Sequence, residues 1–155
     1  MCRMPYLQYF LGKDFQMEDC IFCKIIKGEI PSFKVYEDED VFAFEDINPI
    51  AEGHTLIIPK KHTRDLHEID GDTLTAVQLV SKKIIAAITR ALKPTGVAAM
   101  QLNGESVGQS ILHYHLHLIP RLENEPPLPI SRWEMTPGNM DRIKETAEKI
   151  KSALR

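Results

Sequence analysis

Three of the six histidines of this 155-residue chain lie in one short stretch, residues 108–121. His113, His115 and His117 alternate with aromatic and aliphatic residues, a period-two pattern that is typical of a β-strand. On a strand, the three imidazoles would share one face and form a row about 13 Å long. The row could follow a phosphate and its leaving group, or hold a metal ion. A purely structural role is disfavoured, because imidazole is costly to bury without partners.

A second reactive group is the pair Cys20 and Cys23, which opens a short helix predicted between an N-cap at Asp19 and a stop at Gly28. A spacing of three puts both thiols on one side of the first turn, where backbone dipoles favour thiolate. The pair could be half of a zinc site, a redox pair or two inert buried thiols. The Ile and Phe between the thiols disfavour a redox pair. Half of a zinc site is favoured, and it needs two further ligands, for which histidines are available.

The elements that must position these residues can be predicted from the hydrophobic pattern. A long helix runs from Asp70 or Asp72 to about Leu92, since its apolar residues step by three and four. Asn139 caps a final helix. Besides the histidine stretch, strands are predicted at 33–37, 41–45, 54–59 and 97–102, with the second apolar on both faces and therefore interior. Short connections favour antiparallel order, so we expect an α+β fold in which about five mostly antiparallel strands pack against the long helix.

Composition restricts the partners. A net charge of −3 gives no general electrostatic reason to bind nucleic acid. No apolar run approaches the length of a membrane span, and three cysteines are too few for a secreted disulfide framework. We therefore expect a soluble, cytoplasmic protein without a membrane partner. Residues 1–17 lack periodicity and are interpreted as an N-terminal extension.

The histidine stretch resembles the signature of the histidine-triad (HIT) family of nucleotide hydrolases and transferases. That signature is His-x-His-x-His followed by two apolar residues, here Leu118 and Ile119, with Gly-Gln-Ser in front at 108–110. The resemblance spans roughly residues 18–121 and implies one HIT domain over 18–155 and a homodimer. The Cys-x-x-Cys opening and the Asn-Gly-Glu loop are closer to the HINT-like nucleoside phosphoramidase branch than to the dinucleoside polyphosphate hydrolases.

The resemblance also implies a nucleotide site assembled from several segments. Asp46 would bind the ribose hydroxyls, because a carboxylate can accept hydrogen bonds from both. Apolar side chains would line the base pocket, and the polar loop before the histidines would hold phosphate. Without the resemblance, that loop is an ordinary polar turn. The nucleotide-binding residues implied in this way are Phe22, Ile25, Asp46, Ile47, Asn103, Gln109, Ser110, His115 and His117.

The chemistry implied is hydrolysis of a purine nucleotide, such as a phosphoramidate of AMP, at its α-phosphate. A neutral imidazole is a competent nucleophile near pH 7, so His115 would form a nucleotidyl-histidine intermediate that water then hydrolyses. His117 would donate a hydrogen bond to the transferring phosphate. Ser110 and His117 both suit delivery of a proton to an amine leaving group. His54 matches a family histidine that supports the active site.

His62 matches the zinc-binding histidine of the metal-containing branch of the family. Because His115 and His117 serve the phosphate, His113 is free to complete a closed, structural zinc site with Cys20, Cys23 and His62. One alternative is a metallohydrolase in which His113 and His115 bind an open zinc ion that activates water. Two others are a dinucleoside polyphosphate hydrolase and a nucleotide-binding protein without catalysis.

Overall fold

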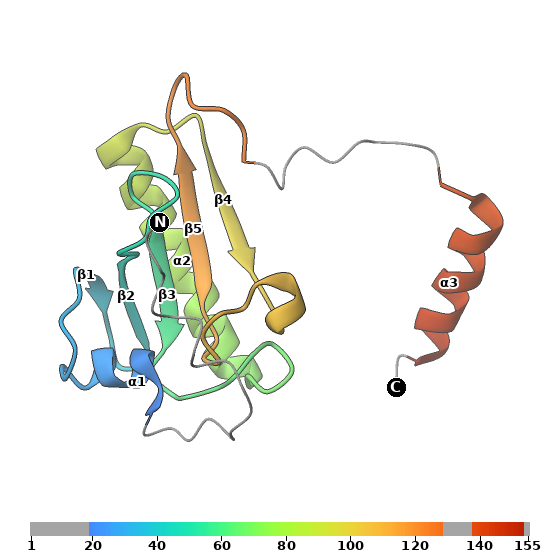
Figure 1. Cartoon of the computed structure of the whole chain (residues 1–155), viewed down its shortest axis with the longest axis horizontal. Coiled ribbons are helices and arrows are strands. Elements are labelled where there is room, and N and C mark those ends of the chain that lie inside the picture. The colour runs from blue at the N-terminus through green and yellow to red at the C-terminus, as the bar shows by residue number, and fades with distance from the viewer. Residues whose placement is uncertain (1–18, 129–137, 154–155) are drawn as a thin grey trace, which may run out of the picture. The chain divides into compact units, whose positions relative to one another are not determined.

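A computed structural model describes residues 19–128 and 138–153. The described residues fall into two units that divide after Glu125, and each is considered by itself. The predicted extension, residues 1–17, lies outside the described part. The first unit contains α1 (Ile21–Ile26), β1 (Lys34–Glu37), β2 (Val41–Glu45), β3 (Thr55–Pro59), α2 (Gly71–Leu92), β4 (Gly96–Gln101), the short 3-10 helix η3 (Glu105–Val107) and β5 (Leu116–Arg121), as Figure 1 shows.

The five strands form one sheet in the order β1-β2-β3-β5-β4, and each neighbouring pair is antiparallel. The predicted α+β class and antiparallel order are therefore confirmed. Val41 to Phe44 are all buried, as expected for the interior strand β2, which is apolar on both faces. The four strands outside the histidine stretch begin and end within about one residue of their predicted bounds, which is the usual uncertainty of such boundaries.

Helix α2 packs on one face of the sheet (Figure 1). It begins where Asp70 accepts a hydrogen bond from the backbone N–H of Thr73 at 2.9 Å, which confirms the predicted N-cap. It ends at Leu92, as predicted, because the C-cap residue Lys93 has a left-handed φ of 50°. The predicted apolar stripe of the helix faces the sheet and forms most of the core on that side. The buried members of the stripe are Val77, Val80, Ile84 and Ile88.

Helix α1 covers the opposite face of the sheet. Cys20, Phe22, Cys23 and Ile25 form a second buried cluster with apolar side chains of β2 and β3. The predicted N-cap at Asp19 is wrong, because Cys20 has the extended backbone of an N-cap and its carbonyl accepts the first helical hydrogen bond. The predicted stop is confirmed, because α1 ends at Ile26 and Gly28 follows with a left-handed φ of +76°.

The histidine stretch differs from its prediction in one respect. Strand β5 begins at Leu116, so only His117 of the three histidines lies in a strand. Before Leu116 the chain leaves the sheet, because the N–H of Tyr114 donates to the carbonyl of Thr63 in the loop after β3. The alternation nevertheless persists. Tyr114, Leu116 and Leu118 all enter the core beneath α2, so the imidazoles between them face the other side.

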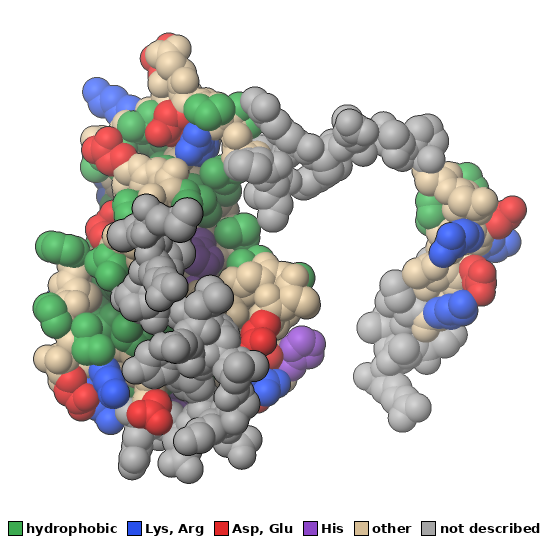
Figure 2. All heavy atoms as spheres, viewed as in Figure 1, with side chains coloured by type: hydrophobic (Ala, Val, Ile, Leu, Met, Phe, Trp, Pro, Cys, Tyr) green, Lys and Arg blue, Asp and Glu red, His purple; other side chains and the backbone are tan. Residues whose placement is uncertain are grey.

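The second unit contains helix α3 (Met140–Ala153). Its start confirms the predicted cap, because Asn139 Oδ1 accepts a hydrogen bond from the N–H of Arg142 at 2.9 Å. Glu145 and Lys149 form an ion pair at 2.6 Å on the exposed surface of the helix. Figure 2 shows charged side chains of both signs along α3. Among the described residues, no helix combines the length and apolar character needed to cross a membrane.

Candidate functional site

Four histidines and one phenylalanine meet on the α1 side of the sheet. The rings of His115 and His117 lie 4.9 Å apart, and those of His54 and His117 lie 5.2 Å apart, measured between centroids. Phe22 of α1 packs edge-on against His113 and His115 at 5.8 and 5.3 Å. Edge-on packing of this kind fixes the orientation of the rings. Helix α1 therefore holds two of the three imidazoles of the row in place.

The two cysteines and two of the histidines form a compact group of ligand atoms. The Sγ of Cys20 lies 3.4 Å from Nδ1 of His113, and the Sγ of Cys23 lies 3.3 and 3.6 Å from the Nδ1 atoms of His62 and His113. The two Nδ1 atoms are 3.2 Å apart. All four ligand atoms lie within 4.8 Å of one another. In tetrahedral zinc coordination, S···N edges of about 3.6 Å and N···N edges of about 3.3 Å are expected. The group fits zinc.

The hydrogen bonding of His113 supports the same conclusion. Its Nε2 donates to the carbonyl of Pro59 at 2.8 Å, so Nδ1 carries the lone pair that faces the thiols. Burial lowers the pKa of His113 to about 4, which keeps the ring neutral. Burial and the adjacent Cys20 raise the pKa of Cys23 to about 11. The neutral imidazole suits a metal ligand, whereas the raised pKa of Cys23 means that this thiol must release its proton when a metal ion binds.

His115 is oriented by the backbone of its neighbour. Its Nδ1 donates to the carbonyl oxygen of His113 at 2.7 Å, so Nε2 carries the free lone pair. Burial lowers the pKa of His115, which keeps the imidazole neutral at physiological pH. A neutral ring with one unprotonated nitrogen is competent to attack an electrophile.

A chain of hydrogen bonds gives His117 the opposite tautomer, with the hydrogen on Nε2. The N–H of Ile50 donates to Nδ1 of His54 at 3.3 Å, so Nε2 of His54 carries a proton. This Nε2 donates to Nδ1 of His117 at 2.9 Å, which leaves Nε2 of His117 as a donor. Asp46 also lies near the pair, with Oδ2 3.7 Å from Nδ1 of His54. The site thus places a nucleophilic nitrogen on one ring beside an N–H donor on the next.

The burial of His117 predicts how stability responds to pH. Burial, followed by the neighbouring His115 and His54, lowers its pKa from 6.5 to about 4. Because the folded pKa is the lower one, the neutral ring stabilises the fold above pH 6.5, and this contribution is lost as the pH falls from 6.5 toward 4. Urea unfolding at several pH values should therefore show a smaller pH slope for His117→Gln than for the parent protein. Identical slopes would contradict a neutral, partly buried His117.

The residues predicted to contact the nucleoside lie around α1 and the turn after β2. Phe22 and Ile25 are buried, whereas Ile47 is 70% exposed. The carboxylate of Asp46 is 19% exposed, and its Oδ1 accepts a hydrogen bond from the N–H of Asn48 at 2.8 Å. Asp46 therefore stabilises this turn through Oδ1, while its Oδ2 lies close to His54.

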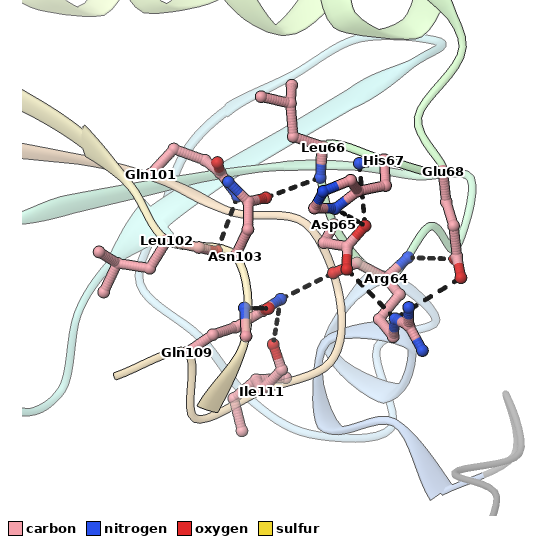
Figure 3. Close-up of polar contacts among 11 residues, drawn as sticks. Arg64, Asp65, Leu66, His67, Glu68, Gln101, Leu102, Asn103, Gln109 and Ile111 are labelled. Carbon is pink, nitrogen blue, oxygen red and sulfur yellow. Dashed lines mark hydrogen bonds and ion pairs between the residues drawn. The ribbon is translucent and has the colours of Figure 1, made fainter. Parts of the chain in front are cut away.

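Two amide side chains of the polar loop before the histidines bond to backbone groups of another loop. Asn103 Oδ1 accepts from the N–H of Leu66 at 2.8 Å, and Gln109 donates to the carbonyl of Arg64 at 2.7 Å (Figure 3). Gln109 is only 2% exposed, whereas Ser110 is exposed. Sequence reasoning missed the partners of these amides, which are backbone groups of the loop after β3. Backbone groups have no sequence signature by which they could have been found.

The family is decided by comparison with known proteins. Residues 27–124 match the family model of the HIT domain. The chain belongs to the HIT family. The adenosine 5′-monophosphoramidase HNT1 of Candida albicans is 41% identical over 139 residues, which cover 87% of this chain and 91% of that protein. The Bacillus subtilis protein named "Protein hit" is 49% identical over 104 residues, which cover 67% of this chain and 72% of that protein.

A solved structure shows the same fold. The crystal structure of a histidine triad nucleotide-binding protein from Candida albicans matches this HIT protein with a TM-score of 0.76 and 40% sequence identity. The match covers 87% of this chain and 96% of that chain.

The predicted site residues of this HIT protein fall into three groups. The four candidate metal ligands come together as one cluster. His54, His115 and His117 also come together, in contact with one another through His117. The third group, the loop from Asn103 to Ser110, presents Ser110 to solvent but turns Gln109 into the protein. His67, for which no role was predicted, has a side chain that is 80% exposed.

Proposed function

We propose that this HIT protein is an enzyme that hydrolyses purine nucleoside phosphoramidates at the α-phosphate, as an adenosine 5′-monophosphoramidase does. The proposal rests on the different tautomers of two neighbouring rings in the histidine row. His115 presents an unprotonated Nε2, while the adjacent His117 presents an N–H. The relative named adenosine 5′-monophosphoramidase HNT1, at 41% identity, supports the substrate class.

In the proposed reaction, Nε2 of His115 attacks the α-phosphorus and the P–N bond to the amine breaks. The departing amine takes a proton from the hydroxyl of Ser110 or from Nε2 of His117. The nucleotide is then bonded through phosphorus to His115. Water attacks this phosphorus and the P–N bond to His115 breaks. The proton that the water releases returns to the group, Ser110 or His117, that protonated the amine, so the nucleoside monophosphate leaves with the ring and the donor regenerated.

The neighbouring groups have distinct parts in this scheme. His117 donates its Nε2–H to a non-bridging phosphate oxygen as negative charge grows there. His54 keeps that hydrogen in place, because it fills the other nitrogen of His117 with its own N–H. Asn103 has its Oδ1 occupied by Leu66, so its amide NH₂ is the group available to the phosphate.

The nucleoside would be held by the segments around α1. Asp46 has an oxygen that is not used in the turn and is the proposed partner of the ribose hydroxyls. The exposed Ile47, with Phe22 and Ile25, would contact the purine base. Apolar side chains with a carboxylate nearby suit a nucleoside, whose base is apolar on its faces and whose sugar is polar.

We also propose that Cys20, Cys23, His62 and His113 hold a structural zinc ion. Four protein ligands close a tetrahedral site, so no position would be left for a reactive water molecule. The ion would instead cross-link α1 to the loop that carries His62 and to the loop that carries His113. A homodimer and a cytoplasmic location complete the proposal. Within residues 19–128, β4 is the last strand of the sheet, so its outer edge is a surface that a second copy could cover.

The zinc-water alternative is less well supported by the geometry. It requires His113 and His115 to share one ion, yet His113 belongs to a group of four ligand atoms that does not include His115. The compact ligand group uses two cysteines in addition to His62 and His113, and this set leaves no open position.

The proposal is tested with the full-length protein, two substrates, adenosine 5′-phosphoramidate and a diadenosine polyphosphate, and AMP as a non-reactive ligand. We expect turnover of the phosphoramidate and, after rapid acid-free quenching, a peptide around His115 that carries one adenylyl group. Preference for the diadenosine compound would show that the protein is a dinucleoside polyphosphate hydrolase instead. AMP binding without turnover of either substrate would identify a binding protein. Turnover without an adduct, lost on brief chelation while the fold persists, would favour the zinc-water route.

A further inference from the structure

Two loops meet beside the metal and histidine groups. The loop over residues 62–69 follows β3 and carries His62, and the loop over residues 102–115 joins β4 to β5 and carries Ser110 and two of the three histidines. Figure 3 shows the side chains of Asn103 and Gln109 reaching from the second loop to the first. The hydrogen bonds that cross the junction are Leu66 N–H to Asn103 Oδ1 at 2.8 Å, Gln109 Nε2 to the Arg64 carbonyl at 2.7 Å and Tyr114 N–H to the Thr63 carbonyl at 2.6 Å.

Gln109 is the best-connected side chain of the junction. Its Oε1 accepts from the N–H of Gly104 at 2.7 Å, and its Nε2 donates to the carbonyls of Arg64 and Ile111 at 2.7 and 3.2 Å. A primary amide has two N–H groups, and both are used inside the protein. Because the side chain is 2% exposed, it has no donor left to offer a phosphate.

The backbone of the second loop makes this inward position possible. Gly104 and Gly108 have φ values of +101° and +96°, a region that other residues adopt only with strain. The chain can therefore reverse within a few residues, with Gln109 pointing into the junction and Ser110 exposed. Fixing Gln109 fixes the backbone that presents Ser110.

Two of the candidate metal ligands lie in these same two loops. His62 belongs to the first loop and His113 to the second, and their Nδ1 atoms are 3.2 Å apart. Gln109 and a bound zinc ion would therefore hold the same pair of loops at two points. We propose that Gln109 is a positioning residue that couples zinc binding to the loop that binds phosphate, and that it is not itself a phosphate ligand. The inference rests on the proposed function for the roles of zinc and of Ser110.

Coupling of this kind is reciprocal, so it can be measured through zinc affinity without any turnover. Competition between the full-length protein and a chromophoric zinc chelator gives that affinity for the parent protein, Gln109→Ala and Gln109→Glu. We expect both variants to bind zinc about tenfold more weakly, as is typical when a group that supports metal ligands is lost. In Gln109→Glu, a carboxylate oxygen would replace Nε2 and face the carbonyl oxygens of Arg64 and Ile111.

AMP affinity provides the second measurement. In the parent protein, AMP should bind more tightly to the zinc-loaded form than to the chelated form, and this difference should shrink in Gln109→Ala. Two control variants separate the coupling from other effects. Glu105→Ala changes an exposed side chain in the same turn, and Val77→Ala weakens the core beneath α2 at a residue that lies outside both loops. We expect both controls to keep the parent zinc affinity.

Several results would overturn the inference. Unchanged zinc affinity in both Gln109 variants, with weaker AMP binding, would make Gln109 a direct phosphate ligand. An equal loss of zinc affinity in Val77→Ala would show that general destabilisation is the cause. A parent protein without zinc affinity would overturn the inference together with the metal site. In contrast, a parent protein that shows the coupling but no turnover would overturn only the proposed activity.

Discussion

Replacing His115 with alanine is expected to lower the turnover of adenosine 5′-phosphoramidate by about 10⁴-fold or more, because it removes the atom that forms the covalent intermediate. The remaining hydrogen-bond donors can still bind the phosphate, so AMP affinity should change much less. The fold should persist, since the two core clusters consist of other residues. Turnover is measured by separation of AMP from the substrate, and the fold by near-ultraviolet circular dichroism.

The matched control for this variant is His67→Ala. His67 is also a histidine but its side chain is 80% exposed, and it lies in the loop after β3 rather than in the row. Its replacement should leave turnover at the parent level. A His115→Ala protein that retains substantial activity would mean that the nucleotide is not transferred to this ring, and the proposed mechanism would then be wrong.

The orientation of the histidines could be predicted from the sequence because it depends on local alternation. Tyr114 and Leu116 are apolar, so they enter the core, and the residues between them must face the other way. This holds even though the chain at His113 and His115 is not yet part of a strand. Similarly, the start of α2 was predictable because the cap, Asp70, acts on a backbone group only three residues away.

The parts that could not be predicted depend on contacts between distant segments. The amide of Gln109 bonds to the carbonyl of Arg64, and Asn103 bonds to the N–H of Leu66. Every residue has such backbone groups, so no pattern identifies these as the partners. A polar residue in a loop before a reactive row therefore suggests a ligand contact, although Gln109 is used within the protein.

The four candidate metal ligands could be predicted only in part from the sequence. The spacing of Cys20 and Cys23 predicts half of a zinc site from local geometry alone. The other half required a family resemblance for His62, which is far from the cysteines in the sequence. Only the fold shows that the sulfur and nitrogen atoms lie at 3.3 to 3.6 Å, the separations that a tetrahedral ion requires.

Removal of the metal is expected to have the largest effect on stability. Cys20 is 1% exposed and its Sγ lies 3.4 Å from Nδ1 of His113, so Cys20→Ser should break the link between α1 and the histidine loop. We expect a loss of about 3 kcal/mol or more, which corresponds to a fall in Tm of about 10 °C. Turnover per folded molecule should fall far less than in His115→Ala, because Cys20 does not contact the reacting atoms. Calorimetry and metal analysis of the purified proteins provide the measurements.

Chelation separates the metal from simple packing. If Cys20 acts through zinc, a chelator should lower the Tm of the parent protein almost to that of Cys20→Ser and should leave the variant nearly unchanged, since the two perturbations remove the same interaction. If the cysteines are two inert buried thiols, the chelator should have no effect, and Cys20→Ser should cost the same with or without it. The effects of chelator and mutation are non-additive in the first outcome and independent in the second, so this cycle decides whether the thiols bind a metal ion.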